Sequence, residues 1–336
     1  MRKSHFAVAA TFVLVAVCAR IDNVVAAPST IAANLPHRPT VSNEFSPSAP
    51  TTGTHKSTYF RTDPRLEFFN ALNALRLAIG VGALRQDPAL DAAAENHLEY
   101  MKLNAAMSHT EIPGNPGFTS PDPYRQVLAV GGSHKQWVGQ NAYNGDIGRC
   151  LASMANSVYH LQGITSNQET IGLAMRDNYC VANFGIVTAD GTGGYGLAQW
   201  GGQQLSPGTG AHYPANNASV HGVFVPAEEI PNPAPDLATA GPPIMFRVNV
   251  ERPSDVLTVS DFTLTGPGGY AVPARILVPA ESKAGSVASA IADASLYRGV
   301  VFLLPTQPIA PGTYKATFAG ARNGVAIHQS WRFTAY

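Results

Sequence analysis

The sequence predicts an α+β domain followed by an all-β domain within a chain of 336 residues. Apolar residues recur at helical spacing between Leu66 and Met101, and short β-prone runs separated by turn residues follow from residue 170. Helices followed by a small antiparallel sheet are typical of α+β domains. Residues 243–336 carry strand patterns with almost no helical spacing, which favours a β-sandwich for this part of the chain.

The first 27 residues have the features of an export signal. A basic start precedes the apolar run Phe6–Ala19, and small residues follow, so we expect cleavage near Ala26 or Ala27. The run is shorter than the about 20 apolar residues that span a bilayer. Lipid attachment at Cys18 is an alternative. No later segment is long and apolar enough to cross a membrane, so we expect a secreted or periplasmic protein without a transmembrane segment in the mature chain.

Composition divides the rest of the chain into four parts. Residues 28–60 are rich in Ser, Thr, Pro and Asn and predict a disordered linker. Residues 61–213 form the α+β domain, and the proline-rich residues 214–242 predict a second linker before the β-sandwich of residues 243–336.

Helices of the α+β domain begin at two Asp-Pro pairs. Asp63-Pro64 and Asp87-Pro88 each place Asp at the cap and Pro at the first helical position. Leu66, Phe69 and Leu72 follow the first pair on one helical face. A third, shorter helix is predicted over residues 149–161.

In the β-sandwich, apolar residues alternate with polar ones around Tyr314 and Trp331, and Asn323-Gly324 is a hairpin turn signal. The segment IAPGTYKATFAG resembles the turn-then-Tyr segment of bacterial immunoglobulin-like domains. The resemblance implies an immunoglobulin-like sandwich that acts as a spacer or an adhesive unit.

The charge content argues against a nucleic-acid partner. Charged residues make up 13% of the chain, against roughly 25% in typical globular domains, and the formal net charge is zero. Proteins that bind nucleic acids need a cluster of Lys and Arg to neutralise phosphates. The sequence has no such cluster.

Two cysteines, Cys150 and Cys180, remain after removal of the signal. In an oxidising compartment an isolated pair is usually a disulfide, although two buried thiols are the alternative. No CxxC motif accompanies them, which argues against a metal site on these residues.

Several short motifs in the α+β domain occur in an order that resembles one family. They are Asn73, Arg76, Asp87-Pro88-Ala89-Leu90, Ser108-His109-Thr110, Gly139-Gln140-Asn141, Ser157, His160 and Ile171-Gly172. The series resembles the bacterial branch of the CAP superfamily, the sperm-coating-protein-like domain of cysteine-rich secretory, antigen 5 and pathogenesis-related 1 proteins. The resemblance covers residues 62–203.

The resemblance implies an α-β-α sandwich with a cleft that is lined by two His and two Glu residues. By position, the histidines fall on His109 and His160. The Glu of the family's GEN motif falls on Gln140, and the second Glu falls near Ser157. Both acids are therefore absent from their expected positions.

These replacements weaken the case for a metal or for acid–base chemistry. Two neutral imidazoles can ligate zinc, but no carboxylate balances the metal charge or orients the rings, so the resemblance implies at most a weakly bound divalent metal. Gln140 forms hydrogen bonds but cannot act as a general base. Glu111 or Glu169 could supply the missing carboxylate. Alternatively, His109 and His160 only fix loops through hydrogen bonds.

Three classes of function follow. We expect a non-catalytic CAP-domain protein whose cleft binds a lipid or sterol, a cell-envelope glycan or a protein. The first alternative is a metal-assisted hydrolase that uses His109 and His160 with Glu111 as the base. The second alternative is a structural or adhesive surface protein. A serine nucleophile is disfavoured, because no G-x-S-x-G motif is present and no acid near Ser157 in the sequence orients His160.

Overall fold

The structure is a computed structural model that describes residues 47–187, 191 and 193–336. The expected signal peptide, residues 1–27, and the first part of the expected linker lie outside the described residues. The described residues belong to a single compact unit.

Both long helices begin at the Asp-Pro pairs, as predicted. Helix α1 covers Pro64–Ile79 and α2 covers Pro88–Asn104. The Asp63 and Asp87 side chains each accept a hydrogen bond from the backbone N–H two residues later. These caps satisfy amides that would otherwise have no partner at the first turn.

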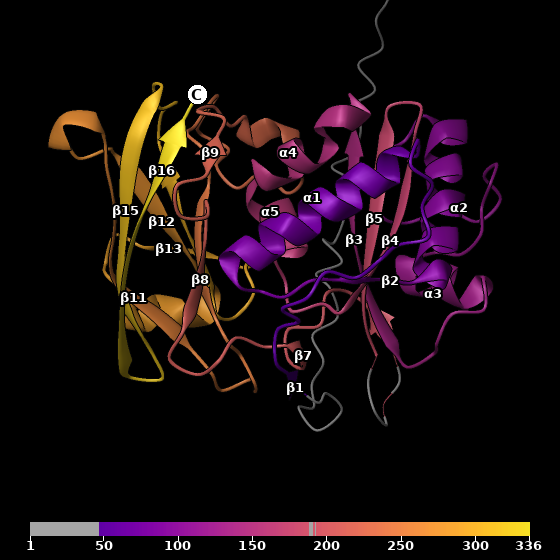
Figure 1. Cartoon of the computed structure of the whole chain (residues 1–336), viewed down its shortest axis with the longest axis horizontal. Helices are drawn as coiled ribbons and strands as arrows, with labels where there is room; N and C mark the ends of the chain where they lie inside the picture. The colour runs from indigo at the N-terminus through magenta and orange to yellow at the C-terminus, as the bar shows by residue number, and fades with distance from the viewer. Residues whose placement is uncertain (1–46, 188–190, 192) are drawn as a thin grey trace, which may run out of the picture. The chain divides into compact units, whose positions relative to one another are not determined.

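A five-stranded sheet lies between two layers of helices. Its order is β2-β4-β5-β3-β6, with antiparallel pairs in the centre and parallel pairs at both edges. The strands are β2 (Arg85–Gln86), β3 (Gln136–Asn144), β4 (Thr170–Arg176), β5 (Tyr179–Val187) and β6 (Gly194–Tyr195). Helices α2 and α3 (Pro123–Ala129) cover one face, and α1, α4 (Cys150–Ala155) and α5 (Val158–Ile164) lie over the other (Figure 1).

The predicted third helix is divided into α4 and α5. Ser157 has an extended backbone, with φ −141° and ψ 159°, and forms the N-cap of α5. The break starts a new helix at Val158, two residues before His160. A disulfide joins Cys150 at the start of α4 to Cys180 on β5, with a Cα–Cα distance of 6.5 Å. The predicted disulfide is confirmed, and it fastens the helix layer to the sheet.

The C-terminal half consists of two further sheets, as the strand patterns predict. One has the order β13-β12-β14-β10-β8 and the other β11-β15-β16-β9. Their strands are β8 (Gly210–Tyr213), β9 (Ser219–Val220), β10 (Ile244–Val248), β11 (Leu257–Thr265), β12 (Ala274–Pro279), β13 (Ile291–Asp293), β14 (Val300–Pro305), β15 (Gly312–Arg322) and β16 (Val325–Ala335). The stacked rings of Phe246 and Phe318, with centroids 3.9 Å apart, join the two sheets.

The boundary near residue 213 and the linker over residues 214–242 are corrected by the structure. Strand β8, assigned by sequence to the first domain, pairs with β10, and β9 pairs with β16. Phe224 and Ala240 are buried. Proline-rich composition gives no periodic signal, yet part of the segment is packed into the fold.

The first expected linker is also structured where it is described. Strand β1 (Pro47–Ser48) pairs with β7 (Gly202–Gln203), and the Thr51 backbone N–H donates to Gln203 Oε1 at 2.7 Å. Residues 47–60 are therefore part of the fold.

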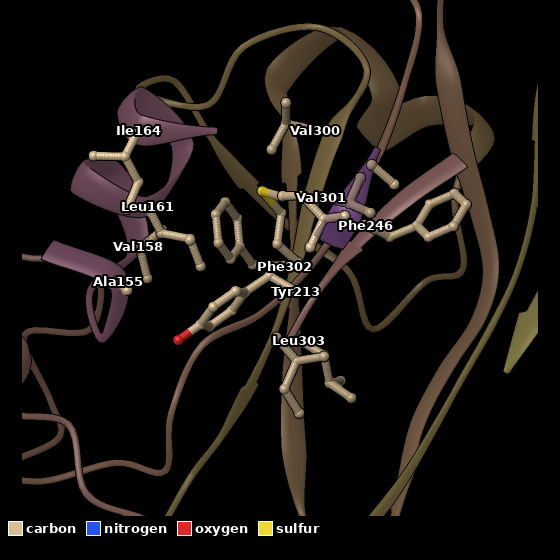
Figure 2. Packing of buried hydrophobic residues seen from close by; sticks show 14 of the residues in the cluster. Ala155, Val158, Leu161, Ile164, Tyr213, Phe246, Val300, Val301, Phe302 and Leu303 are labelled. Atoms are coloured by element: carbon tan, nitrogen blue, oxygen red, sulfur yellow. The ribbon is translucent and has the colours of Figure 1, made fainter. Parts of the chain in front are cut away.

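The hydrophobic core is continuous between α5 and the β8–β10–β14 sheet. Val158, Leu161 and Ile164 of α5 belong to the same buried cluster as Tyr213 and Phe302 of that sheet (Figure 2). Helix α5 thus packs on strands of the C-terminal half as well as on β3. Within the described part of the chain, no helix combines the length and the apolar character that a membrane span requires.

Candidate functional site

His109 is held by a chain of side-chain amides. Asn183 on β5 donates from Nδ2 to the Leu90 carbonyl, and its Oδ1 accepts from Gln140 Nε2 at 2.9 Å. Gln140 Oε1 therefore faces His109, whose Nδ1 lies 2.9 Å away. Because this oxygen only accepts, Nδ1 of His109 carries the hydrogen, and in the neutral ring Nε2 keeps its lone pair.

The surroundings of His109 keep its ring neutral. Burial lowers its pKa to about 4, because the charged ring is poorly solvated there. The hydrogen bond to Gln140 opposes this shift, whereas the nearby His160 and His97 add to it. At neutral pH, His109 is therefore a hydrogen-bonding group without charge.

His160 is held by two oxygen atoms at one ring nitrogen. Its Nδ1 lies 3.1 Å from Glu229 Oε1 and 3.1 Å from Ser157 Oγ. Ser157 Oγ also donates to the Met154 carbonyl. Both oxygens near Nδ1 thus act as acceptors, which places a hydrogen on Nδ1 of His160.

Glu229 is a residue of the site that the sequence analysis did not identify. Its side chain is buried, and its carboxylate accepts backbone hydrogen bonds from Val158, Tyr159 and His160 at 2.6–3.0 Å. Ser157, the position on which the second acid of the resemblance falls, contacts the same ring nitrogen of His160 as Glu229 does. The sequence signal at Glu229 is a pair of adjacent acids in PAEEIP. Because Glu229 is 69 positions from His160 along the chain, this signal does not predict their contact.

Strand β3 connects the two histidines. The Gln140 side chain contacts His109, and the next residue, Asn141, donates from Nδ2 to the His160 carbonyl at 2.9 Å. Successive residues of a strand point to opposite faces of the sheet. Gln140 therefore holds His109 on one face of the sheet, and Asn141 holds α5 on the other face.

Glu111 does not take part in this arrangement. Its Oε1 lies 2.9 Å from His97 Nδ1, and its Oε2 accepts from the Thr119 backbone at 2.6 Å. Burial alone would raise the pKa of Glu111, but the hydrogen bonds from His97 and Thr119 lower it. The expectation that Glu111 acts as the base of the cleft is wrong, because both of its oxygens are engaged in a separate buried cluster.

This cluster holds the loop that carries His109. His97 Nε2 lies 2.7 Å from the Ser108 carbonyl, so contacts with His97 fix the residues on both sides of His109. His97, on α2, also stacks on Tyr100. Glu169, the other acid considered, accepts from Ser48 Oγ and lines a different cavity with Arg85.

The residues do not form a complete metal site. Over residues 47–187, 191 and 193–336, no three or more His, Cys, Asp or Glu side chains are grouped to hold a metal ion. Structural zinc sites use four ligands and catalytic zinc sites use three from the protein. His109 and His160 supply two.

A cavity of about 210 Å³ adjoins His160, Ser157 and Glu229. Its walls combine polar and apolar groups, including Tyr143, Arg149, Asn156, Phe224 and Glu228. Residues of α4 and of the segment after β9 both contribute, so the cavity lies where the two halves of the chain meet.

Residues 69–187 match the family model of CAP, the cysteine-rich secretory protein family. This part of the chain is therefore similar to the CAP family. The matched region contains His109, Gln140, Ser157 and His160, but it ends before Glu229.

Three solved structures are similar to parts of the chain. An outer surface protein of Borrelia burgdorferi is 16% identical over 40% of this chain and 99% of its own, with a TM-score of 0.33. An extracellular protein from Bacillus anthracis containing an SCP domain is 18% identical over 38% of this chain and 44% of its own, with a TM-score of 0.32. The copper resistance protein PcoC from Escherichia coli is 14% identical over 37% and 95%, with a TM-score of 0.22. These TM-scores are low, and the assignment of the domain rests on the family match. A search of curated proteins finds no match.

Proposed function

We propose that this is an exported, non-catalytic binding protein that holds a polar ligand, a cell-envelope glycan, in the cavity beside His160. Export is supported by the basic start and apolar run of residues 1–27. The two facing sheets of the C-terminal half support an immunoglobulin-like module that serves as a second contact surface.

The hydrogen bonds at His160 are the main support for a binding role. In a serine–histidine–acid triad, the serine and the acid face different nitrogens of the ring, so that the histidine accepts the serine proton. Here Ser157 and Glu229 face the same nitrogen, Nδ1. His160 donates to both of them, and Ser157 therefore has no base.

The size and lining of the cavity favour a glycan over a sterol. Its volume is about 210 Å³, whereas pockets that enclose drug-sized apolar ligands measure roughly 300–1,000 Å³ and are mainly hydrophobic. Arg149, Asn156 and Glu228 offer hydrogen bonds to hydroxyl and amide groups, and Tyr143 offers a ring face. This combination suits one or two sugar units.

Calorimetric titration with a β-1,4-linked N-acetylglucosamine tetrasaccharide tests the proposal. We expect saturable binding that Arg149→Ala weakens about tenfold, because a charged hydrogen-bond donor is lost. Arg332→Ala is the matched control, since Arg332 is exposed on β16 and does not line the cavity. Absence of saccharide binding, or retention of cholesterol from vesicles in its place, would overturn the proposal.

A further inference from the structure

We propose that Glu229 is the positioning residue of His160, and that the C-terminal half is thereby a structural part of the CAP-domain cleft. The inference deepens the proposed function, since it concerns the same cavity. It rests on the contacts of one buried carboxylate and of the helix that it caps.

The Glu229 carboxylate accepts four hydrogen bonds. Oε1 accepts from the backbone of Tyr159 and His160 and lies 3.1 Å from His160 Nδ1, while Oε2 accepts from Val158. Three of these bonds converge on Oε1, and all four donors belong to one helical turn. Both the backbone and the ring of His160 are oriented by a single side chain.

Ser157 cannot fix the helix in the same way. It occupies the N-cap position, where Ser usually accepts from an amide of the first turn. In this protein Ser157 makes no side-chain cap bond, and its hydroxyl faces the Met154 carbonyl and the His160 ring. Glu229 performs the capping in its place.

The C-terminal half also holds α5 at three further points. Tyr159 donates to Asp293 at 2.8 Å, and the two ends of the Gln162 amide bond Ser295 and Tyr297. Arg247 donates to the Thr165 carbonyl at the end of the helix. The helix is therefore bonded to the C-terminal half from its first turn to its last.

The apolar face of α5 makes the same connection. Val158 and Leu161 are fully buried in the cluster that contains Tyr213 and Phe302 (Figure 2). The position of His160 thus depends on residues beyond the region that matches the CAP family model.

The test reads the proton positions of the His160 ring in the full chain without ligand. With ¹⁵N-labelled histidine, long-range ¹H–¹⁵N spectra at neutral pH distinguish a ring protonated at Nδ1 from one protonated at Nε2, and His160→Gln assigns the signals. In Glu229→Ala, we expect loss of the Nδ1–H form in favour of the Nε2–H form that a free histidine side chain prefers. Glu228→Ala is the matched control, because Glu228 is the adjacent, exposed acid of the same cavity, and it should leave the signals unchanged.

A rescue variant separates positioning from general stability. Ser157→Asp in the Glu229→Ala background places a carboxylate near His160 Nδ1 and supplies a favourable N-cap. We expect it to restore the Nδ1–H form.

An unchanged His160 ring in a folded Glu229→Ala protein would overturn the inference. If that variant does not fold, Glu229→Gln decides, because it keeps an acceptor but removes the charge. The Nδ1 proton should then move upfield, and an unmoved signal would contradict the inference. Since no ligand is present, the result is independent of whether the protein binds a glycan.

Discussion

Glu229 Oε1 lies 3.1 Å from His160 Nδ1, although the two residues are 69 positions apart in the sequence. The contact joins the segment between β9 and β10 to helix α5. The carboxylate lies beside the same ring nitrogen as Ser157, the position on which the second Glu of the resemblance falls.

Removing this carboxylate should destabilise the protein. Glu229→Ala leaves three backbone amides of the first turn of α5 without their acceptor, so we expect a loss of about 3 kcal/mol in the free energy of unfolding. Glu228→Ala should change it by less than about 0.5 kcal/mol, because that side chain is exposed. Urea denaturation of the full chain measures both. Equal stabilities of the two variants would show that Glu229 does not cap α5.

Introducing an acid at the other histidine should increase metal affinity. In Gln140→Glu, a carboxylate replaces the amide 2.9 Å from His109 Nδ1, and we expect about tenfold tighter zinc binding, since such acceptors typically change affinity by about 10–100-fold. Calorimetry with zinc compares the variant with the natural protein. The same substitution combined with His109→Ala should show no gain.

If Gln140 serves only to fix the loop, its substitution should change stability by about 1 kcal/mol and leave zinc binding as it was. Equal, negligible heats in the two proteins would show that His109 and His160 do not hold zinc.

The pH dependence of His109 should differ from that of a solvated histidine. Its pKa is lowered from 6.5 to about 4. In the unfolded chain this histidine is protonated below pH 6.5, whereas in the folded protein it is protonated only below about pH 4. The contribution of His109 to stability is therefore lost progressively as pH falls from 6.5 to 4. An NMR titration of the ring should show a midpoint near 4, and a midpoint near 6.5 would mean that the ring is solvated.

The buried pair of His97 and Glu111 should make the free energy of unfolding depend on pH below about 4.5. The pKa of Glu111 is lowered below its usual 4.5, so its contribution to stability is present above pH 4.5 and is lost as pH falls through the folded-state value. Glu111→Gln should destabilise the protein at pH 7 and make its unfolding free energy less dependent on pH below 4.5. If the slopes of the variant and the natural protein were identical in acid, the proposed pairing would fail.

Sequence reasoning located the elements that depend on local chemistry. The caps at Asp63 and Asp87 act within two residues, and the apolar spacing after each identifies the buried face of the helix. The family motifs placed His109, Gln140 and His160, since their order along the chain is itself the signal. The division of the third helix at Ser157 was missed, because Ser is tolerated within helices as well as at caps.

The contacts between distant segments could not be predicted in this way. Nothing near Glu229 in the sequence indicates that its carboxylate reaches α5, and proline-rich composition suggested that the segment was unstructured. Glu111 was misassigned for the opposite reason, because its closeness to His109 in sequence does not determine the direction of its side chain. Its partner is His97, on the helix α2 that precedes this loop.

The protonation of the His160 ring in the natural protein at neutral pH tests the account most directly. Long-range ¹H–¹⁵N spectra of the full chain should show a hydrogen on Nδ1, donated to Glu229 and Ser157. A ring with its hydrogen on Nε2 and a bare Nδ1 would contradict the account. Glu229 would then have no proton to accept, and Ser157 would face a base that could activate it.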